Sequence, residues 1–203
     1  MNAFLARLIG AGRFALLAIL LGVSLAGCGV NNIPTQEETA KAKWSQVLNQ
    51  YQRRADLIPN LVETVKGYAK QEAQVLEAVV NARARATSVQ LPADVLNNPE
   101  AFKKFQEAQS QLSGALGRLL VVTEAYPELK SNQNFLALQS QLEGTENRIS
   151  VARRDYIEAV QAYNTELKTF PGVIWASTLY KGNKPMETFT IAEETKRPPQ
   201  VKF

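Results

Sequence analysis

The chain has 203 residues, with 23 Lys plus Arg, 19 Asp plus Glu, no His and a single Cys. Without histidine it can form no Ser-His-Asp triad, no Cys-His nucleophile and no imidazole metal site, and one cysteine makes neither an intramolecular disulfide nor a CxxC site. A chain that is 45% hydrophobic and 21% charged is neither disordered nor a polytopic membrane protein, and this length suits one domain.

Residues 1–27 have the composition of a secretory signal peptide. They contain no Asp or Glu, their only charges are Arg7 and Arg13, and an apolar run from Phe14 to Val23 follows these charges. That run is short for a retained membrane span, which needs about 20 apolar residues. The segment then ends in Leu-Ala-Gly-Cys at positions 25–28, which looks like a bacterial lipobox with the chain's one Cys at the lipidated position.

We therefore predict cleavage before Cys28 and a lipid on its thiol. Such a protein is anchored to the non-cytoplasmic side of a bacterial membrane without spanning it. The alternative is a plain apolar anchor that happens to end in Cys. Because Gly29 and not Asp follows the Cys, the outer membrane is favoured over the inner one.

The apparent basicity of the chain is partly a property of this signal. Removing residues 1–27 takes away two arginines, so 21 basic residues face 19 acidic ones and the mature net charge is +2. This small excess argues against a nucleic-acid partner.

Residues 28–34 are predicted to form a tether, and 35–172 a helical bundle domain. Thr35 and Glu38 match a capping box, and apolar or small residues then recur in alternating steps of four and three to about Ser88. This pattern predicts one long amphipathic helix, kinked but not ended at Pro59. Its seam is Trp44, Leu48, Tyr51, Ala55, Ile58, Val62, Val65, Ala69, Ala73, Leu76 and Val80.

Two further helices follow. Asn98 as N-cap and Pro99 in the first turn start a helix that reaches about Ala125, and Ser131-Asn132 caps another that reaches about Thr169. Long seams joined by short connections fold antiparallel. The predicted fold is all-α: an antiparallel bundle of three long helices, with a short C-terminal helical turn and an extended tail.

The tail, residues 173–203, is predicted to pack on or beside the bundle. Its helical turn is expected at Val173–Ala176, and the prolines after Gly182 favour an extended chain. Trp175 is the aromatic residue that we expect to be exposed and to mark a contact surface.

Two stretches carry a family resemblance. Residues 53–69 read RRADLIPNLVETVKGYA, and residues 146–164 include ENRI at 146–149 and ARRDY at 152–156. Together these stretches resemble the LemA family, as do Phe170–Gly172 and Ala192–Glu194 near the end. The resemblance spans nearly the whole mature chain. It implies an antiparallel helical bundle tethered at its N-terminus to a bacterial membrane, with no established enzyme activity.

The chain departs from the family pattern in three places. LemA-like proteins usually keep an uncleaved N-terminal membrane helix, whereas this apolar run ends in a lipobox. Many have His where Gln71 stands, and many end in Asp-Phe where this chain has Lys202-Phe203. The first departure changes the expected mode of membrane attachment and leaves the expected fold unchanged.

Polar residues of the family motif form two groups, which antiparallel pairing would bring together near Pro59. One interpretation is a site for a ligand or partner. The other, which we favour, is an interhelical network that fixes register, in which Asn147 or Arg148 bonds the carbonyl released by Pro59. The groups are Arg53, Arg54, Asp56, Asn60 and Glu63 in the first helix, and Asn147, Arg148, Arg154 and Asp155 in the third.

These observations predict a membrane-anchored cell-envelope protein that acts as a non-catalytic helical scaffold or interaction protein. Its expected partners are the membrane, through lipidated Cys28, and other envelope proteins. We expect no cofactor and no metal, because carboxylate metal sites in bundles commonly include His. The alternative is a ligand-binding or hydrolytic protein that uses the groups around Asp56/Asn60 and Asn147/Asp155, and a pocket that holds Asp56 or Asp155 would favour it.

Overall fold

Helices account for all regular secondary structure in the part of the chain that the structure describes. This part, in a computed structural model, is residues 29–190. The predicted signal peptide, Cys28, Ala192–Glu194 and Lys202-Phe203 lie outside it. The all-α bundle is confirmed. Its elements are α2 (Asn32–Tyr68), η1 (Lys70–Glu72), α3 (Ala73–Ser88), η2 (Val95–Asn97), α4 (Pro99–Thr123), α5 (Pro127–Lys130), α6 (Gln133–Glu166) and α7 (Gly172–Thr178).

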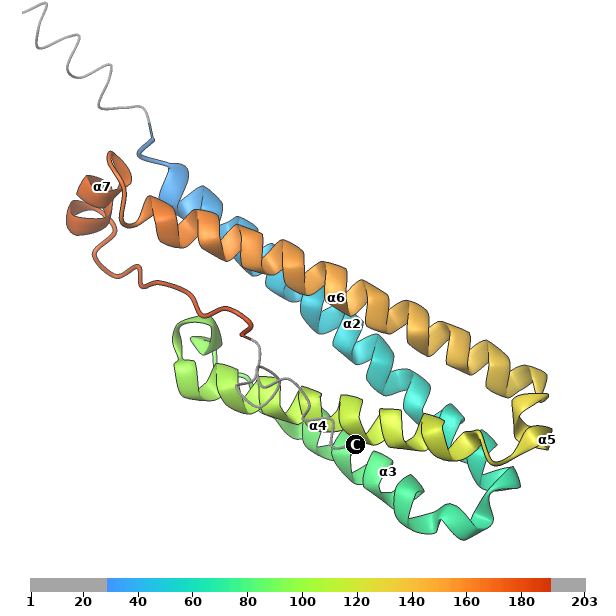
Figure 1. Cartoon of the computed structure of the whole chain (residues 1–203). Helices are drawn as coiled ribbons and strands as arrows, with labels where there is room; N and C mark the ends of the chain where they lie inside the picture. Colours follow the sequence, from blue (N-terminus) through green and yellow to red (C-terminus); the bar gives the residue numbers. More distant parts are fainter. Residues whose placement is uncertain (1–28, 191–203) are drawn as a thin grey trace, which may run out of the picture.

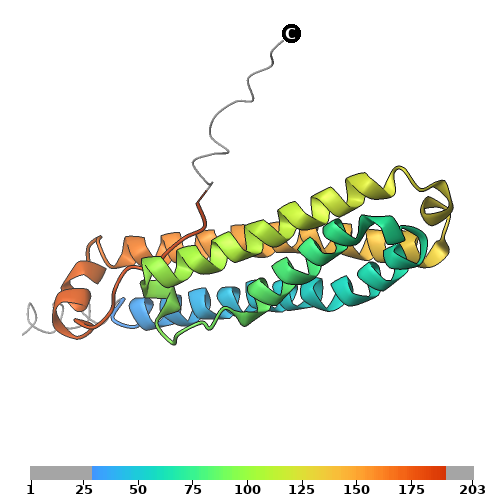
Figure 2. The same ribbon diagram turned by 90° about the horizontal axis from the view of Figure 1, so that it is seen from below.

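The longest helices, α2 and α6, lie side by side and antiparallel over their whole length, and α3 and α4 form a second antiparallel pair against α2 (Figures 1 and 2). Polar contacts join α2 and α6 near one end, where Asn32 Nδ2 lies 3.3 Å from Glu166 Oε1. At the other end, Asn132 Nδ2 donates to the Tyr68 hydroxyl over 2.8 Å. Across residues 29–190, every helix is too short or too polar to cross a bilayer.

The prediction of one helix from Thr35 to Ser88 is wrong at its start and in its continuity, although α3 does end at Ser88. Helix α2 begins at Asn32, before the capping box, and Ile33 is fully buried. It ends at Tyr68, and the chain reverses through Ala69 and η1 into α3. Gly67 weakens the last turn because glycine loses the most backbone freedom in a helix. The bundle therefore has four main helices among the described residues, where three were predicted.

Tertiary packing explains the reversal. The predicted seam accounts for only one of the buried faces of α2. The structure buries a second stripe on α2, formed by Val47, Arg54 and Leu61. A single straight helix paired with α6 alone could not bury both stripes, whereas the return of α3 and α4 gives α2 further neighbours.

Pro59 lies inside α2, and the helix depends on α3 to satisfy a backbone carbonyl near it. Proline has no N–H, so the carbonyl of Ala55, four residues earlier, loses its intrahelical donor. Arg83 of α3 supplies that donor, with its Nε 2.7 Å from the Ala55 oxygen. The prediction that Asn147 or Arg148 bonds this carbonyl is wrong, since both residues are exposed on α6.

The starts of the other two long helices are as predicted. The Asn98 side chain accepts from the Ala101 amide over 3.1 Å, and Pro99 occupies the first turn of α4. The Asn132 side chain accepts from the Phe135 amide over 3.0 Å at the start of α6. Each cap satisfies a backbone donor that has no partner within its own helix.

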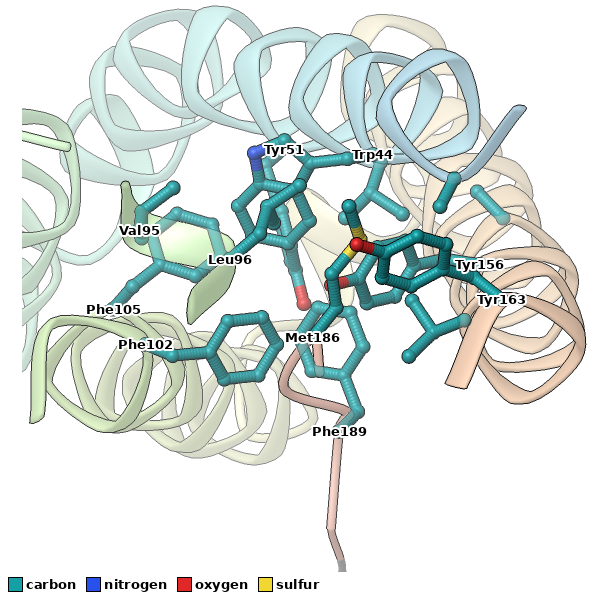
Figure 3. Packing of buried hydrophobic residues seen from close by; sticks show 14 of the residues in the cluster. Trp44, Tyr51, Val95, Leu96, Phe102, Phe105, Tyr156, Tyr163, Met186 and Phe189 are labelled. Atoms are coloured by element: carbon teal, nitrogen blue, oxygen red, sulfur yellow. The ribbon is translucent and has the colours of Figure 1, made fainter. Parts of the chain in front are cut away.

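Aromatic rings fill the half of the bundle nearest α7 (Figure 3). The Trp44 ring lies at their centre, with its centroid 5.5 Å from that of Phe102 and 5.3 Å from those of Phe105 and Tyr156. Such tilted and edge-on pairs add to the free energy gained from burial. A second cluster, mostly aliphatic and centred on residues such as Ile58 and Leu119, fills the other half.

Residues 183–190, here called the strap, run in an extended conformation between α6 and α4 (Figure 1). Met186 and Phe189 are buried in the aromatic cluster. The Tyr156 hydroxyl donates to the Glu187 carbonyl over 2.7 Å, and the Asn164 side chain bonds both the amide and the carbonyl of Met186. The predicted docked, extended tail is thus confirmed as far as residue 190.

The expectation for Trp175 is wrong. Its ring is half-buried against the aromatic cluster, because α7 lies on the end of the bundle. The exposed aromatic residue of this region is Phe170, which is 80% accessible to solvent.

Gly172 provides a test of how α7 is placed. A β-carbon at this position would lie 2.1 Å from the backbone oxygen of Glu166, so only glycine fits there. We expect Gly172→Ala to lower the thermal unfolding midpoint. Gly117→Ala, in open space on α4, should raise stability by about 0.5–1 kcal/mol. Calorimetry of both variants checks this, and a Gly172→Ala protein as stable as wild type would contradict the packing described for α7.

Tyr156 links stability to alkaline pH. Burial, assisted by the nearby Glu187, raises the pKa of its hydroxyl well above the ordinary value of 10.0. The unfolded chain therefore loses this proton at a lower pH than the folded protein does, so stability is complete below about pH 10 and falls above it. We expect the free energy of unfolding to decline less steeply above pH 10 in Tyr156→Phe than in wild type. Chemical denaturation at a series of pH values measures this decline, and equal slopes in the two proteins would contradict the effect described for Tyr156.

Candidate functional site

Most of the predicted polar residues do not converge. Arg53, Asp56, Asn60, Glu63, Asn147, Arg148 and Arg154 are exposed. The Asp56 carboxylate accepts from Gln52 of its own helix over 2.8 Å, and Glu63 pairs with Lys66 one turn away. These are ordinary pairs on a helix surface, which stabilise a helix by a few tenths of a kcal/mol.

Arg154 and Asp155 of the second group lie at a different level of the bundle from Asp56. Asp155 is half-buried and pairs with Lys43 at 3.1 Å, and Arg154 approaches the same carboxylate at 3.9 Å. Lys43 and Asp56 are separated by about 20 Å along α2, from the rise of 1.5 Å per residue. The expectation that the two groups meet near Pro59 is therefore wrong. Asn60 and Glu63 instead line an open hollow with Asn134 and Gln141 of α6.

Arg54 is the exception, because its side chain is only 1% exposed. Its Nη1 donates to Ser113 Oγ over 2.7 Å and to Glu146 Oε1 over 2.9 Å. Its Nη2 donates to Gln109 Oε1 over 2.6 Å and to the Gln109 carbonyl over 3.3 Å. The ring of Tyr51 lies 5.0 Å from the guanidinium carbon, so a cation–π contact completes the surroundings.

Arg54, Gln109, Ser113 and Glu146 form what we call the Arg54 layer. It crosses the bundle between the aromatic cluster and the aliphatic cluster. Since Gln109 Nε2 also lies 3.4 Å from the Ala86 carbonyl, the layer contacts all four main helices. A buried charge is tolerated only where acceptors replace water, so this layer permits a single alignment of α2, α4 and α6.

A hollow of about 350 Å³ opens beside the Arg54 layer. Arg153 of α6 and Thr190 of the strap line it, and Gln106 Nε2 donates to the Thr190 carbonyl over 2.6 Å. The Arg153 guanidinium lies 4.4 Å from the centre of the Phe189 ring. Burial raises the pKa of the Tyr51 hydroxyl at this hollow, against the opposing effect of the Arg153 and Arg54 charges.

The polar groups that line this hollow are mostly bonded to one another. Its carboxylate, Glu146, is already bonded to Arg54, and its serines have no histidine or free carboxylate positioned as a base. Within residues 29–190, no three Cys, Asp or Glu side chains come together in a way that could hold a metal ion. Around Arg54 the arrangement is an interhelical polar network, whose other members, Gln109, Ser113 and Glu146, do not belong to the two predicted groups.

The sequence held a signal for Gln109 that seam analysis passed over. The apolar seam of this helix contains Phe102, Phe105, Leu112 and Leu116. It steps by seven residues from Phe105 to Leu112, and Gln109 occupies the position where the next apolar residue is expected. A polar residue at a core position of a heptad seam commonly specifies register. Ser113 and Glu146 lie beside the seams and carry no such signal.

The sequence model described as LemA family matches residues 43–203, from α2 to the end of the chain. This protein belongs to the LemA family. The match includes every member of the Arg54 layer and the strap.

Curated relatives extend the comparison to named proteins. The chain is similar to magnetosome proteins MamQ 1 and MamQ 2 of Paramagnetospirillum magneticum, each 26% identical over 157 residues. It is also similar to magnetosome protein MamQ of Magnetospirillum gryphiswaldense, with 24% identity over 157 residues. These alignments cover 70% of this LemA-family chain and 58% of each relative, so the chain spans less than two thirds of the length of the proteins it matches.

Adjacent arginines give a matched test of the Arg54 layer. Arg54→Met removes the donor for Gln109 and Glu146. The Glu146 carboxylate is 41% exposed and can turn to water, whereas Gln109 stays buried without its partner, which costs about 1–3 kcal/mol. Arg53→Met changes an exposed neighbour and should alter stability by less than about 0.5 kcal/mol. Chemical denaturation measures both. An equal, small loss in the two variants would show that the Arg54 layer contributes little to folding.

Proposed function

We propose that this LemA-family protein is a bacterial cell-envelope protein, anchored by lipid on Cys28 to the non-cytoplasmic side of a membrane. Its bundle then acts as a non-catalytic scaffold that presents surfaces to other envelope proteins. The lipobox at 25–28 is the observation that carries the proposal, because only residues 29–31 separate it from the start of α2. A lipid at Cys28 would therefore hold the folded bundle directly at the bilayer. The relatives named above come from bacteria, which agrees with a bacterial lipobox.

The placement of the acidic residues supports a non-catalytic role over the hydrolytic alternative. Asp56 is exposed and bonded within its own helix, and Asp155 is paired with Lys43. A hydrolase needs an acid and a base held within reach of one bound substrate. These two carboxylates lie at separate levels of the bundle, and the buried member of the set, Arg54, is bonded to protein acceptors.

Lipid labelling tests the anchor. Cells that express wild type should incorporate labelled palmitate into the protein and retain it in the membrane fraction. Cys28→Ser should lose the label and shift to the soluble fraction or stay as an uncleaved precursor, because it lacks the thiol. Ser24→Ala, which lies just before the Leu-Ala-Gly-Cys motif, serves as the control and should behave as wild type. Unchanged labelling of Cys28→Ser would refute the anchor.

Two further experiments test which membrane holds the protein and whether it contacts other envelope proteins. Density-gradient separation should place wild type in the outer membrane, and Gly29→Asp should shift it toward the inner one, because Asp after the lipidated Cys disfavours outer-membrane sorting in enteric lipoproteins. Crosslinking in intact cells followed by mass spectrometry should recover a second envelope protein. Recovery of self-crosslinks alone would count against the scaffold role.

A further inference from the structure

Large apolar side chains gather in solvent at the end of the bundle that carries α7. Phe170 is 80% exposed, Leu179 63%, Ile174 45% and Val173 41%. We call these four residues the α7 end face. Of the nine large apolar side chains that are exposed among the described residues, four belong to this short segment. Such a cluster marks a surface that contacts something less polar than water.

The inner side of the same segment is firmly held. Gly172 packs against the Glu166 backbone, and Trp175, Ala176 and Tyr180 pack on the aromatic cluster. Because this inner side is docked, α7 cannot simply turn over to bury the α7 end face within the bundle.

The chain enters the structure beside this face. Gly29, which directly follows Cys28, has its backbone against Pro171, since a β-carbon on Gly29 would lie 3.5 Å from Pro171 Cγ. Three residues on, Asn32 Nδ2 is 3.3 Å from Glu166 Oε1. Both views of the ribbon show the start of α2 and α7 at one end of the bundle, and α5 at the other (Figures 1 and 2).

The charges around this end suit an anionic surface. Between positions 166 and 184 the acidic residue is Glu166, which accepts from Asn32, whereas Lys168, Lys181 and Lys184 are exposed. Residues 29–36 contain no charged side chain. Glu37, which accepts from Asn183, and Glu38 follow on α2, and both carboxylates pair with Lys41. Lysines beside apolar side chains favour the interface of an anionic bilayer.

We propose that the α7 end face docks on the lipid bilayer next to the anchor at Cys28. The apolar side chains enter the boundary between headgroups and acyl chains, and the lysines lie among the headgroups. This inference rests on the proposed lipid anchor and adds an orientation to it: the bundle stands on its α7 end. Since α6 has 34 residues, α5 is then held about 50 Å from the bilayer.

Fluorescence quenching tests this orientation in the full chain. Ile174→Cys and Leu136→Cys each add one thiol, the first on the α7 end face and the second at the far end of α6, where Leu136 is 49% exposed. Each variant is purified from membranes, labelled with an environment-sensitive maleimide, and reconstituted into phosphatidylethanolamine and phosphatidylglycerol vesicles with brominated acyl chains. We expect about a twofold or larger fall in fluorescence at position 174 and none at 136, since docked side chains reach about 5–10 Å into the interface.

Paired substitutions separate docking from mere proximity to the anchor. In the I174C chain, Phe170→Ser with Leu179→Ser should restore most of the lost fluorescence by removing the two most exposed apolar groups of the face. Val80→Ser with Val121→Ser removes two comparably exposed side chains, 48% and 72%, elsewhere on the bundle and should change nothing. Unaltered circular dichroism of all variants confirms that they fold.

The outcomes distinguish this inference from the proposed function. Maleimide labelling of wild type would mean that Cys28 is unmodified, which refutes the lipid anchor and the inference with it. An unlabelled wild type together with an unquenched position 174 would refute the docking alone and leave the anchor standing. Crosslinks from position 174 to a second copy of the chain would also overturn the docking, because that copy would then cover the face.

Discussion

The burial of one guanidinium constrains the whole bundle. Arg54 lies on the central helix α2 at a depth where an unpaired charge would cost several kcal/mol, and acceptors from two other helices meet its Nη1 and Nη2. Gln109 and Ser113 come from α4, and Glu146 comes from α6. If any of these helices shifted by one turn, the guanidinium would lose its acceptors and face the apolar side chains of the neighbouring clusters. The seams supply most of the stabilising burial, while the Arg54 layer selects one alignment among the many that a repeating seam allows.

A second constraint acts through Pro59. Inside a long helix this residue leaves the Ala55 carbonyl without a donor, and Arg83 of α3 replaces that donor. The carbonyl that Pro59 leaves free in α2 thereby binds α3, the helix that folds back on it. The two arginines act alike, since each satisfies polar groups that α2 alone cannot satisfy. In this LemA-family protein such links join the helices that surround α2 into one packed body.

The two ends of this body differ in composition and in role. Near the start of α2, aromatic rings, the strap and α7 close the bundle, and the α7 end face stays in solvent beside the point where the lipidated residue is proposed. At the other end the core is aliphatic and α5 caps the turn. The strap bonds α6 and η2 through Tyr156, Asn164 and Leu96, so the chain returns from the base along the bundle toward its middle.

Sequence alone determined the class of this fold and the caps of two helices, because a heptad seam and an Asn N-cap are local patterns that hold in any setting. It also determined that Arg54 belongs to a set of polar family residues. Only the tertiary structure decided that α2 ends at Tyr68, that Arg83 serves Pro59, and that Arg54 is buried while its neighbour Arg53 is exposed. These outcomes depend on which helices pack against each buried face of α2. The spacing of apolar residues along the sequence cannot show whether a helix has one packed face or two.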